Sequence, residues 1–170
     1  VGSITSKENA DLVALTIMNT NTAGLSGAIM VAVIMQLVYK KLDLTMILNG
    51  ALGGLVSITA GPDLYDIYTP ILIGAIGGCL VVFGVSFFDK VRIDDPVGAL
   101  SVHLVNGIWG TIAVGIFVSN GDDITLLGQL KGIILIGIFA FVSSYIILFI
   151  INKIMPLRAG NDEEMQGLDV

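Results

Sequence analysis

The stretch GIILIGIFAFVSSYIILFII, residues 132–151, contains no charged side chain. A bilayer core of about 30 Å is crossed by roughly 20 apolar residues in a helix. A helix on the surface of a soluble protein would instead need a polar stripe toward water, and this stretch has none. It therefore predicts a transmembrane helix, which we extend over residues 126–154.

Four more apolar stretches precede it, over residues 12–38, 44–60, 67–88 and 96–118. The chain is 55% hydrophobic and only 13% charged, with a mean hydropathy of +0.92. A soluble domain typically carries about 25% charged residues. The sequence predicts an all-α polytopic membrane protein with five transmembrane helices in residues 1–158, followed by an acidic tail over residues 159–170.

Charge asymmetry between the short loops predicts the orientation, because cytoplasmic loops carry an excess of Lys and Arg. If the five spans alternate in direction, one side of the membrane holds Lys40, Lys41, Lys90, Arg92, Lys153 and Arg158. The other side holds Asp63, Asp66, Asp122 and Asp123, with Lys7 and Lys131 as its cations. We therefore expect a multi-pass protein of the cell membrane with a cytoplasmic C-terminus.

Several classes of function find no support in the composition. The net charge of −6 and the lack of a basic patch argue against nucleic-acid binding. One cysteine, Cys79, and one histidine, His103, build neither a disulfide framework nor a metal cluster, so we expect no metal and no cofactor. The chain starts with Val1 and shows no signal peptide, so we expect it to begin partway through a longer protein.

Two glycine-rich runs lie in the second and third spans, as NGALGG over residues 49–54 and GAIGG over residues 74–78. Each contains small residues four apart, which lets helix backbones approach closely in a membrane. We interpret both runs primarily as packing seams, with a pore-lining role as the alternative. Asn49 and Thr59, near the two ends of the second span, are predicted to form hydrogen bonds between helices.

The fourth span carries the only histidine. Asp95 is predicted to cap the helix, with Pro96 at its first position. At helical spacing a stripe of small and polar residues follows one face, made of Pro96, Ala99, His103, Asn106, Gly107 and Gly110. We expect this stripe to face protein or a cavity rather than lipid.

Ionisable residues inside spans are costly and usually mark substrate paths, proton relays or polar pairs. His103 therefore has two readings from the residues alone: a hydrogen bond that serves packing, or a functional group in a transport path. Apolar surroundings favour the neutral imidazole, which offers one donor and one acceptor. Such a group suits a small polar solute or a proton relay.

The stretch RIDDPVGALSVH, residues 92–103, continues to NGIWGT at residues 106–111 and resembles a signature of the Amt/Mep/Rh ammonium transporters. The run LNGALGGLVSITAG, residues 48–61, is similar to another motif of that family. Gly2-Ser3, Asn19-Thr20-Asn21 and the tail DEEMQGLD, residues 162–169, also resemble the family. In order and without large gaps, the chain resembles the second half of an eleven-helix subunit.

This resemblance implies a homotrimer that transports ammonium or ammonia, with methylammonium as an analogue, through one apolar pore per subunit. His103 matches the second of two pore histidines, and Ser3 matches a serine that helps to bind ammonium at the outer vestibule. The tail resembles a regulatory segment, which in some members works through a PII signal protein. Leu104 and Asn106 depart from the glycine and cysteine that the family often has there.

Three alternatives remain. An ammonium sensor on the same membrane scaffold would carry a signalling domain after the tail. A membrane-embedded enzyme using His103 would need a second histidine, a metal cluster or an intramembrane carboxylate at helical spacing, and the sequence has none. A non-transporting membrane subunit conflicts with the polar stripe around His103.

Overall fold

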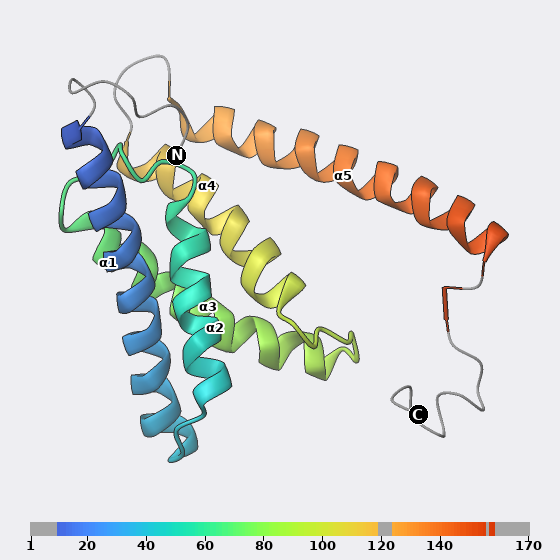
Figure 1. Ribbon diagram of the computed structural model, residues 1–170, viewed down its shortest axis with the longest axis horizontal. Helices are drawn as coiled ribbons and strands as arrows, with labels where there is room; N and C mark the ends of the chain where they lie inside the picture. The colour runs from blue at the N-terminus through green and yellow to red at the C-terminus, as the bar shows by residue number, and fades with distance from the viewer. Residues whose placement is uncertain (1–9, 119–123, 156, 159–170) are drawn as a thin grey trace. The chain divides into compact units, whose positions relative to one another are not determined.

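The computed structural model describes residues 10–118, 124–155 and 157–158, and all of the regular structure in these residues is helical (Figure 1). The elements are α1 (Ala10–Ile34), η2 (Met35–Tyr39), α2 (Leu44–Ile58), α3 (Thr69–Lys90), η3 (Ala99–Leu104), α4 (Val105–Phe117) and α5 (Leu126–Ile154), where η2 and η3 are π-helical turns. The predicted all-α class is confirmed. The chain divides into two compact units, Val1–Leu130 and Lys131–Val170.

In the described part of the chain, four helical stretches are long and apolar enough to cross a membrane: Ala10–Tyr39, Thr69–Lys90, Ala99–Phe117 and Leu126–Ile154. The predicted span over residues 44–60 corresponds to α2, an apolar helix of 15 residues. At 1.5 Å per residue, α2 is about 22 Å long, shorter than the core of a typical bilayer. It ends early because the chain turns at Gly61, whose N–H donates to Ile58 O (3.2 Å).

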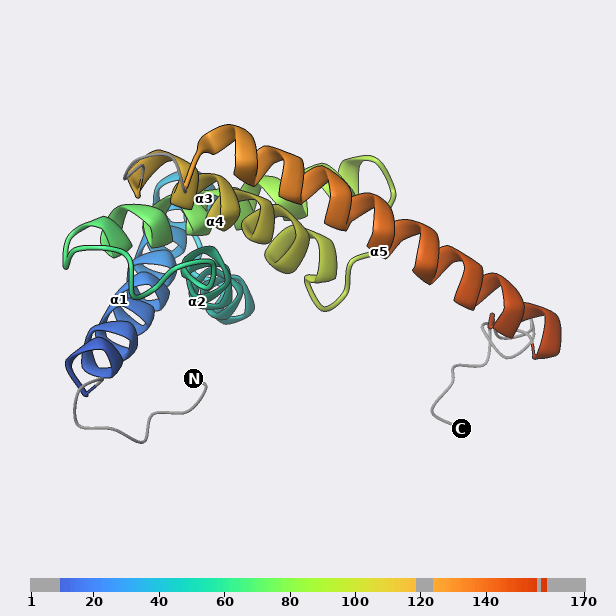
Figure 2. The ribbon, with the colours of Figure 1, turned by 90° about the horizontal axis from the view of Figure 1, so that it is seen from above.

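The first unit is built on three helices that contact one another, α1, α2 and α3 (Figures 1 and 2). Their shared seam is made of glycine. Gly27 of α1 lies against Gly50 of α2 and Gly74 of α3, and Gly54 lies against the carbonyl of Ala23. A Cβ on any of these glycines would overlap backbone or side-chain atoms of a neighbouring helix. The interpretation of both glycine runs as packing seams is therefore confirmed.

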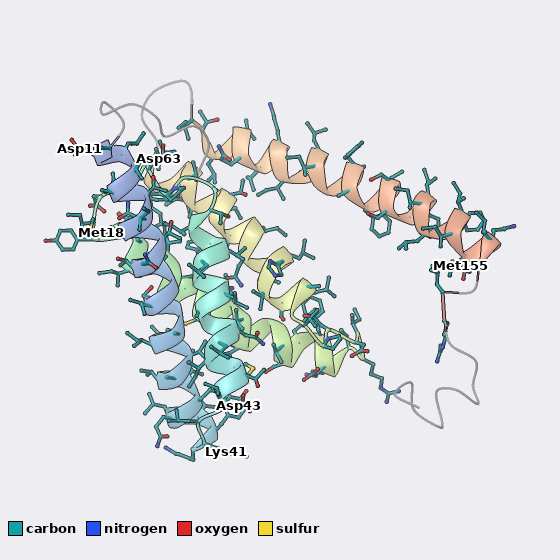
Figure 3. The ribbon with its side chains drawn as sticks, in the orientation of Figure 1. Asp11, Met18, Lys41, Asp43, Asp63 and Met155 are labelled. Carbon is teal, nitrogen blue, oxygen red and sulfur yellow. The ribbon has the colours of Figure 1, made fainter. Side chains whose placement is uncertain are left out.

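The ends of this unit carry different charges. Asp43 caps α2 by accepting a hydrogen bond from the backbone N–H of Met46 (2.9 Å). Lys41 and Asp43 lie at one end of the unit, and Asp11 and Asp63 lie at the other (Figure 3). The α1 and α2 helices are therefore antiparallel, as alternating spans require.

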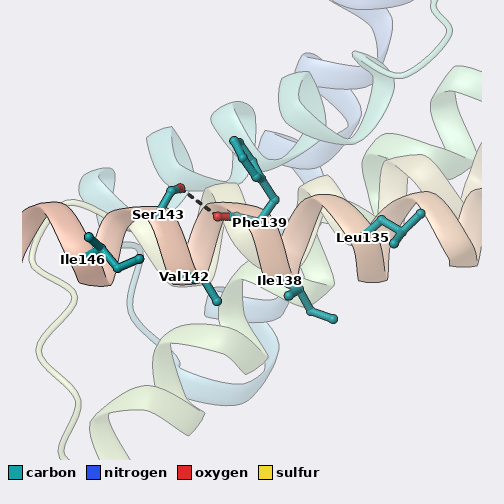
Figure 4. A pocket seen from close by; sticks show the side chains of 6 residues that line it. All are labelled: Leu135, Ile138, Phe139, Val142, Ser143 and Ile146. Atoms are coloured by element: carbon teal, nitrogen blue, oxygen red, sulfur yellow. Dashed lines mark hydrogen bonds between the residues drawn. The ribbon is translucent and has the colours of Figure 1, made fainter.

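The fifth helix, α5, has 29 residues and no buried residue. Its aromatic rings form a ladder at four-residue spacing, with Phe141–Tyr145 and Tyr145–Phe149 centroids 6.5 and 6.3 Å apart, and Lys153 Nζ stands 5.2 Å from the last ring. Figure 4 shows a shallow apolar groove along this helix, in which the Ser143 hydroxyl is bonded to its own backbone at Phe139 O (2.7 Å). This groove presents no free polar group of its own to a ligand.

Candidate functional site

The site begins in the loop before the fourth span, where Asp95 organises the first helical turn. Its carboxylate accepts hydrogen bonds from Leu100 N (3.0 Å), Ser101 N (2.8 Å) and Ser101 Oγ (2.7 Å). These N–H groups have no partner within the helix, and a carboxylate there also complements the helix dipole. The prediction that the Asp95 carboxylate caps the helix is confirmed, but the prediction that Asp95 occupies the N-cap position is wrong.

The helix starts three residues later than predicted. Pro96 lies in a turn outside it, and Gly98 holds the N-cap position with φ of 73°, in the left-handed region that favours glycine. The loop thereby brings the carboxylate of Asp95 back over the first turn. A side chain at position 98 would also meet Val102, whose Cγ2 would stand 2.7 Å from its Cβ.

The first turn of the span, η3, is π-helical rather than α-helical. His103 N donates to Gly98 O (3.2 Å), and Val105 N donates to Leu100 O, both five residues back. Because these hydrogen bonds span five residues instead of four, the segment before Val105 is rotated relative to the α-helix after it. The predicted single stripe is therefore wrong, because its members lie on different faces.

His103 lies within the π-helical turn and its side chain is exposed, as are those of Ala99 and Pro96. Among residues 10–118 no group forms a hydrogen bond with the imidazole. Asn106 is fully buried between α2 and α3, and Gly110 is buried against Ser57 of α2. The imidazole of His103 and the amide of Asn106 therefore lie in different surroundings, the first exposed and the second fully buried.

Asn106 is the centre of a buried polar cluster. Its Nδ2 donates to Ser101 O (3.2 Å), and its Oδ1 lies 3.1 Å from Ser57 Oγ on α2. Since the carbonyl of Ser101 only accepts, it fixes which end of the amide faces it. Space for the amide comes from Gly53 and Gly77, where an added Cβ would stand 3.1 Å from its atoms.

The helix-to-helix hydrogen bonds come from residues other than those predicted. Thr59 Oγ1 donates to Val56 O within its own helix, and Asn49 forms no hydrogen bond with any described residue. Asn19 instead ties α1 to the following loop, with its Nδ2 donating to Pro62 O (2.8 Å) and Tyr65 O (3.0 Å). Between helices, Ser57 Oγ meets Asn106 Oδ1 (3.1 Å) and the half-buried Trp109 Nε1 donates to Ile73 O (3.1 Å). Sequence spacing alone does not identify these pairs.

Comparison with known proteins identifies the family. The model of the Ammonium Transporter Family matches residues 1–170. The chain belongs to this family. A putative ammonium transporter of Synechocystis sp. is 42% identical over 131 residues, covering 77% of this chain and 29% of that protein. The ammonium transporter Amt2 of Archaeoglobus fulgidus is 33% identical over 169 residues, covering 89% and 36%.

The fold agrees with this assignment. The solved structure of a Sensor Amt Protein superposes with a TM-score of 0.85 at 28% identity, covering 94% of this chain and 42% of that one. The chain thus spans about a third of the length of the first two relatives and less than half of this structure. Ser3 and the tail over residues 159–170 lie outside the described residues, so the structure does not test their predicted roles.

No group of three or more His, Cys, Asp or Glu that could hold a metal ion occurs in the described parts of the chain. Cys79 is a free, half-buried thiol of α3. In this member of the ammonium transporter family, the chemistry available near His103 is therefore that of one imidazole, the buried amide of Asn106 and the anchoring carboxylate of Asp95.

Asp95 should make stability depend on pH at the acidic end. Its partial burial would raise its pKa, but the hydrogen bonds from Leu100, Ser101 and Ala99 outweigh burial and lower the pKa below 3.8. A lowered pKa contributes stability that is fully present above the unfolded value and lost as pH falls through the folded value. We expect Asp95→Asn to remove this loss, so that the difference in Tm from wild type shrinks between pH 7 and pH 3. A difference that stays constant over this range would contradict the assignment.

Proposed function

We propose that this chain forms part of the wall of an ammonium-conducting pore, in which His103 faces the substrate path. One observation supports this most directly: His103 lies inside a membrane-spanning helix, yet its side chain projects outward with no hydrogen-bond partner among residues 10–118. An ionisable group in that position is costly unless it meets a polar partner or solute. A small polar substrate passing the exposed side of η3 would supply one.

The chemistry follows from the hydration of ammonium. An apolar pore does not replace the hydration shell of an ion cheaply, so the cation is recruited at an outer site and loses a proton before it passes. We propose that Ser3, which matches the vestibule serine of the family, supplies a hydroxyl at that outer site, where the aromatic residues of the family attract the cation. Neutral ammonia then exchanges hydrogen bonds with the neutral imidazole of His103, which donates with one nitrogen and accepts with the other.

The whole protein is proposed to act as a homotrimer in the cell membrane, with the C-terminus in the cytoplasm. The loop charges support this orientation, since the cationic end of the first unit is the end that holds Lys41. The acidic tail would then lie where a cytoplasmic regulator such as a PII signal protein could contact it. Neither a metal nor a cofactor has a role in this mechanism.

Transport is tested by uptake of labelled methylammonium into cells that lack their own ammonium transporters and express the full-length protein. We expect uptake above that of cells with an empty vector, and competition by unlabelled ammonium. A protein present in the membrane at normal levels that gives no uptake would overturn the proposal. If that protein still binds ammonium, the result would favour the sensor, the function in the name of the Sensor Amt Protein.

A further inference from the structure

The π-helical turn that carries His103 leaves one backbone carbonyl without a helical donor. The last bond of the π ladder joins Val105 N–H to Leu100 O, and the chain continues from Val105 as α-helix. When a ladder changes from five-residue to four-residue spacing, the next carbonyl is passed over, and here that carbonyl is Ser101 O. A buried carbonyl left without a donor costs about 1–3 kcal/mol.

Asn106 supplies the missing donor. Its Nδ2 lies 3.2 Å from Ser101 O, and both residues are fully buried. The side-chain amide therefore takes the place of a backbone N–H in the ladder. Its Oδ1 lies 3.1 Å from Ser57 Oγ, whose single proton is shared with Gly53 O at 2.7 Å, and the two glycines at 53 and 77 give the amide a slot between α2 and α3.

We infer that Asn106 is a positioning residue, which holds the π-helical turn in place and so sets the direction of the His103 imidazole. Without the bond to Ser101, the buried carbonyl loses its donor, so the turn is destabilised and opens more often, and the α-helical conformation is among the states that it then reaches. If the hydrogen bonds of the turn changed from five-residue to four-residue spacing, the preceding segment would rotate by about 100° about the helix axis. His103 lies in that segment, so its imidazole would turn away from the proposed substrate path.

This inference rests on the proposed function only for its transport readout, because the conformation of the turn is measured separately. The main variant is Asn106→Ala, which removes the donor. The matched control is Ser57→Ala, which removes the other partner of the amide and leaves the bond to Ser101 O intact. Both changes delete buried polar groups of one cluster, so general loss of packing affects both.

Hydrogen exchange of the full-length protein, read by mass spectrometry over residues 99–106, reports the turn directly. We expect Asn106→Ala to raise exchange there by roughly tenfold and to leave exchange in the glycine seam of α1–α3 unchanged. Ser57→Ala should change exchange in the turn far less. Equal exchange in wild type and Asn106→Ala would overturn the inference, as would an equal rise across the whole protein.

Methylammonium uptake adds the functional readout. A misdirected imidazole should lower the maximal rate by about tenfold or more, with a smaller effect on KM, because recruitment at the outer site does not involve the turn. Ser57→Ala should keep most of the rate. If Asn106→Ala alters exchange in the turn but transport persists at the wild-type rate, the link to His103 is wrong. If His103→Ala is itself without effect, the proposed pore role fails instead, while the assignment of Asn106 to the turn is still decided by exchange.

Discussion

Replacement of His103 by alanine in the full-length protein should abolish methylammonium uptake or make it unselective. A polar solute that loses its hydrogen-bond partner in apolar surroundings is destabilised by about 3 kcal/mol. A barrier raised by that amount slows passage by roughly a hundredfold. The measurement is initial uptake of labelled methylammonium, with unlabelled ammonium and alkali cations as competitors to report selectivity.

The same helical turn offers a matched control. Leu104 follows His103 directly and is half-exposed, so Leu104→Ala removes a comparable volume from the turn without removing a polar group. We expect Leu104→Ala to retain most of the uptake. His103→Gln keeps a donor and an acceptor and should retain part of it. Uptake by His103→Ala that matches wild type in both rate and selectivity would exclude His103 from the substrate path.

Much of the fold was predictable because the membrane imposes simple rules on the sequence. The helix α5 covers residues 126–154, as expected, because the charge-free stretch between Lys131 and Lys153 is long enough to cross a membrane as one helix. The third span begins as expected near Thr69-Pro70, since proline fits the first turn of a helix. The glycine seam followed from spacing, because only glycine permits backbones to approach so closely.

The geometry around His103 was not predictable to the same degree. A stripe drawn at 3.6 residues per turn assumes an unbroken α-helix, and apolar periodicity carries no mark of a π-helical turn. The local signal was Gly98 ahead of the span, which in the structure adopts a positive φ and shifts the helix start. The partners of Asn106 lie on the same turn and on α2, 49 residues away at Ser57, so they are set by tertiary packing.

The close contact between α1 and α2 in the glycine seam predicts that replacement of Gly54 will lower the stability of the protein. Gly54→Ala places a methyl group against the backbone carbonyl of Ala23, at a distance that real contacts do not reach. The obstacle is backbone, which yields only if α1 and α2 move apart and lose their contact. Overpacking of this kind costs about 3 kcal/mol. We expect a lower Tm and a lower yield of folded protein in detergent, measured on the full-length chain.

Gly24→Ala in the same seam is the matched control. There the added methyl would meet Leu55 Cδ2 at 2.9 Å, the far end of a flexible side chain that a change of rotamer can move aside. Alanine also has the higher helix propensity, by about 1 kcal/mol, which offsets part of any crowding. Gly24→Ala should therefore fold with a Tm near that of wild type, while Gly54→Ala does not. Equal losses of Tm in both variants would mean that direct backbone contact at Gly54 does not set the crossing of α1 and α2. The contacts of Gly27 with Gly50 and Gly74 would then be the next to test.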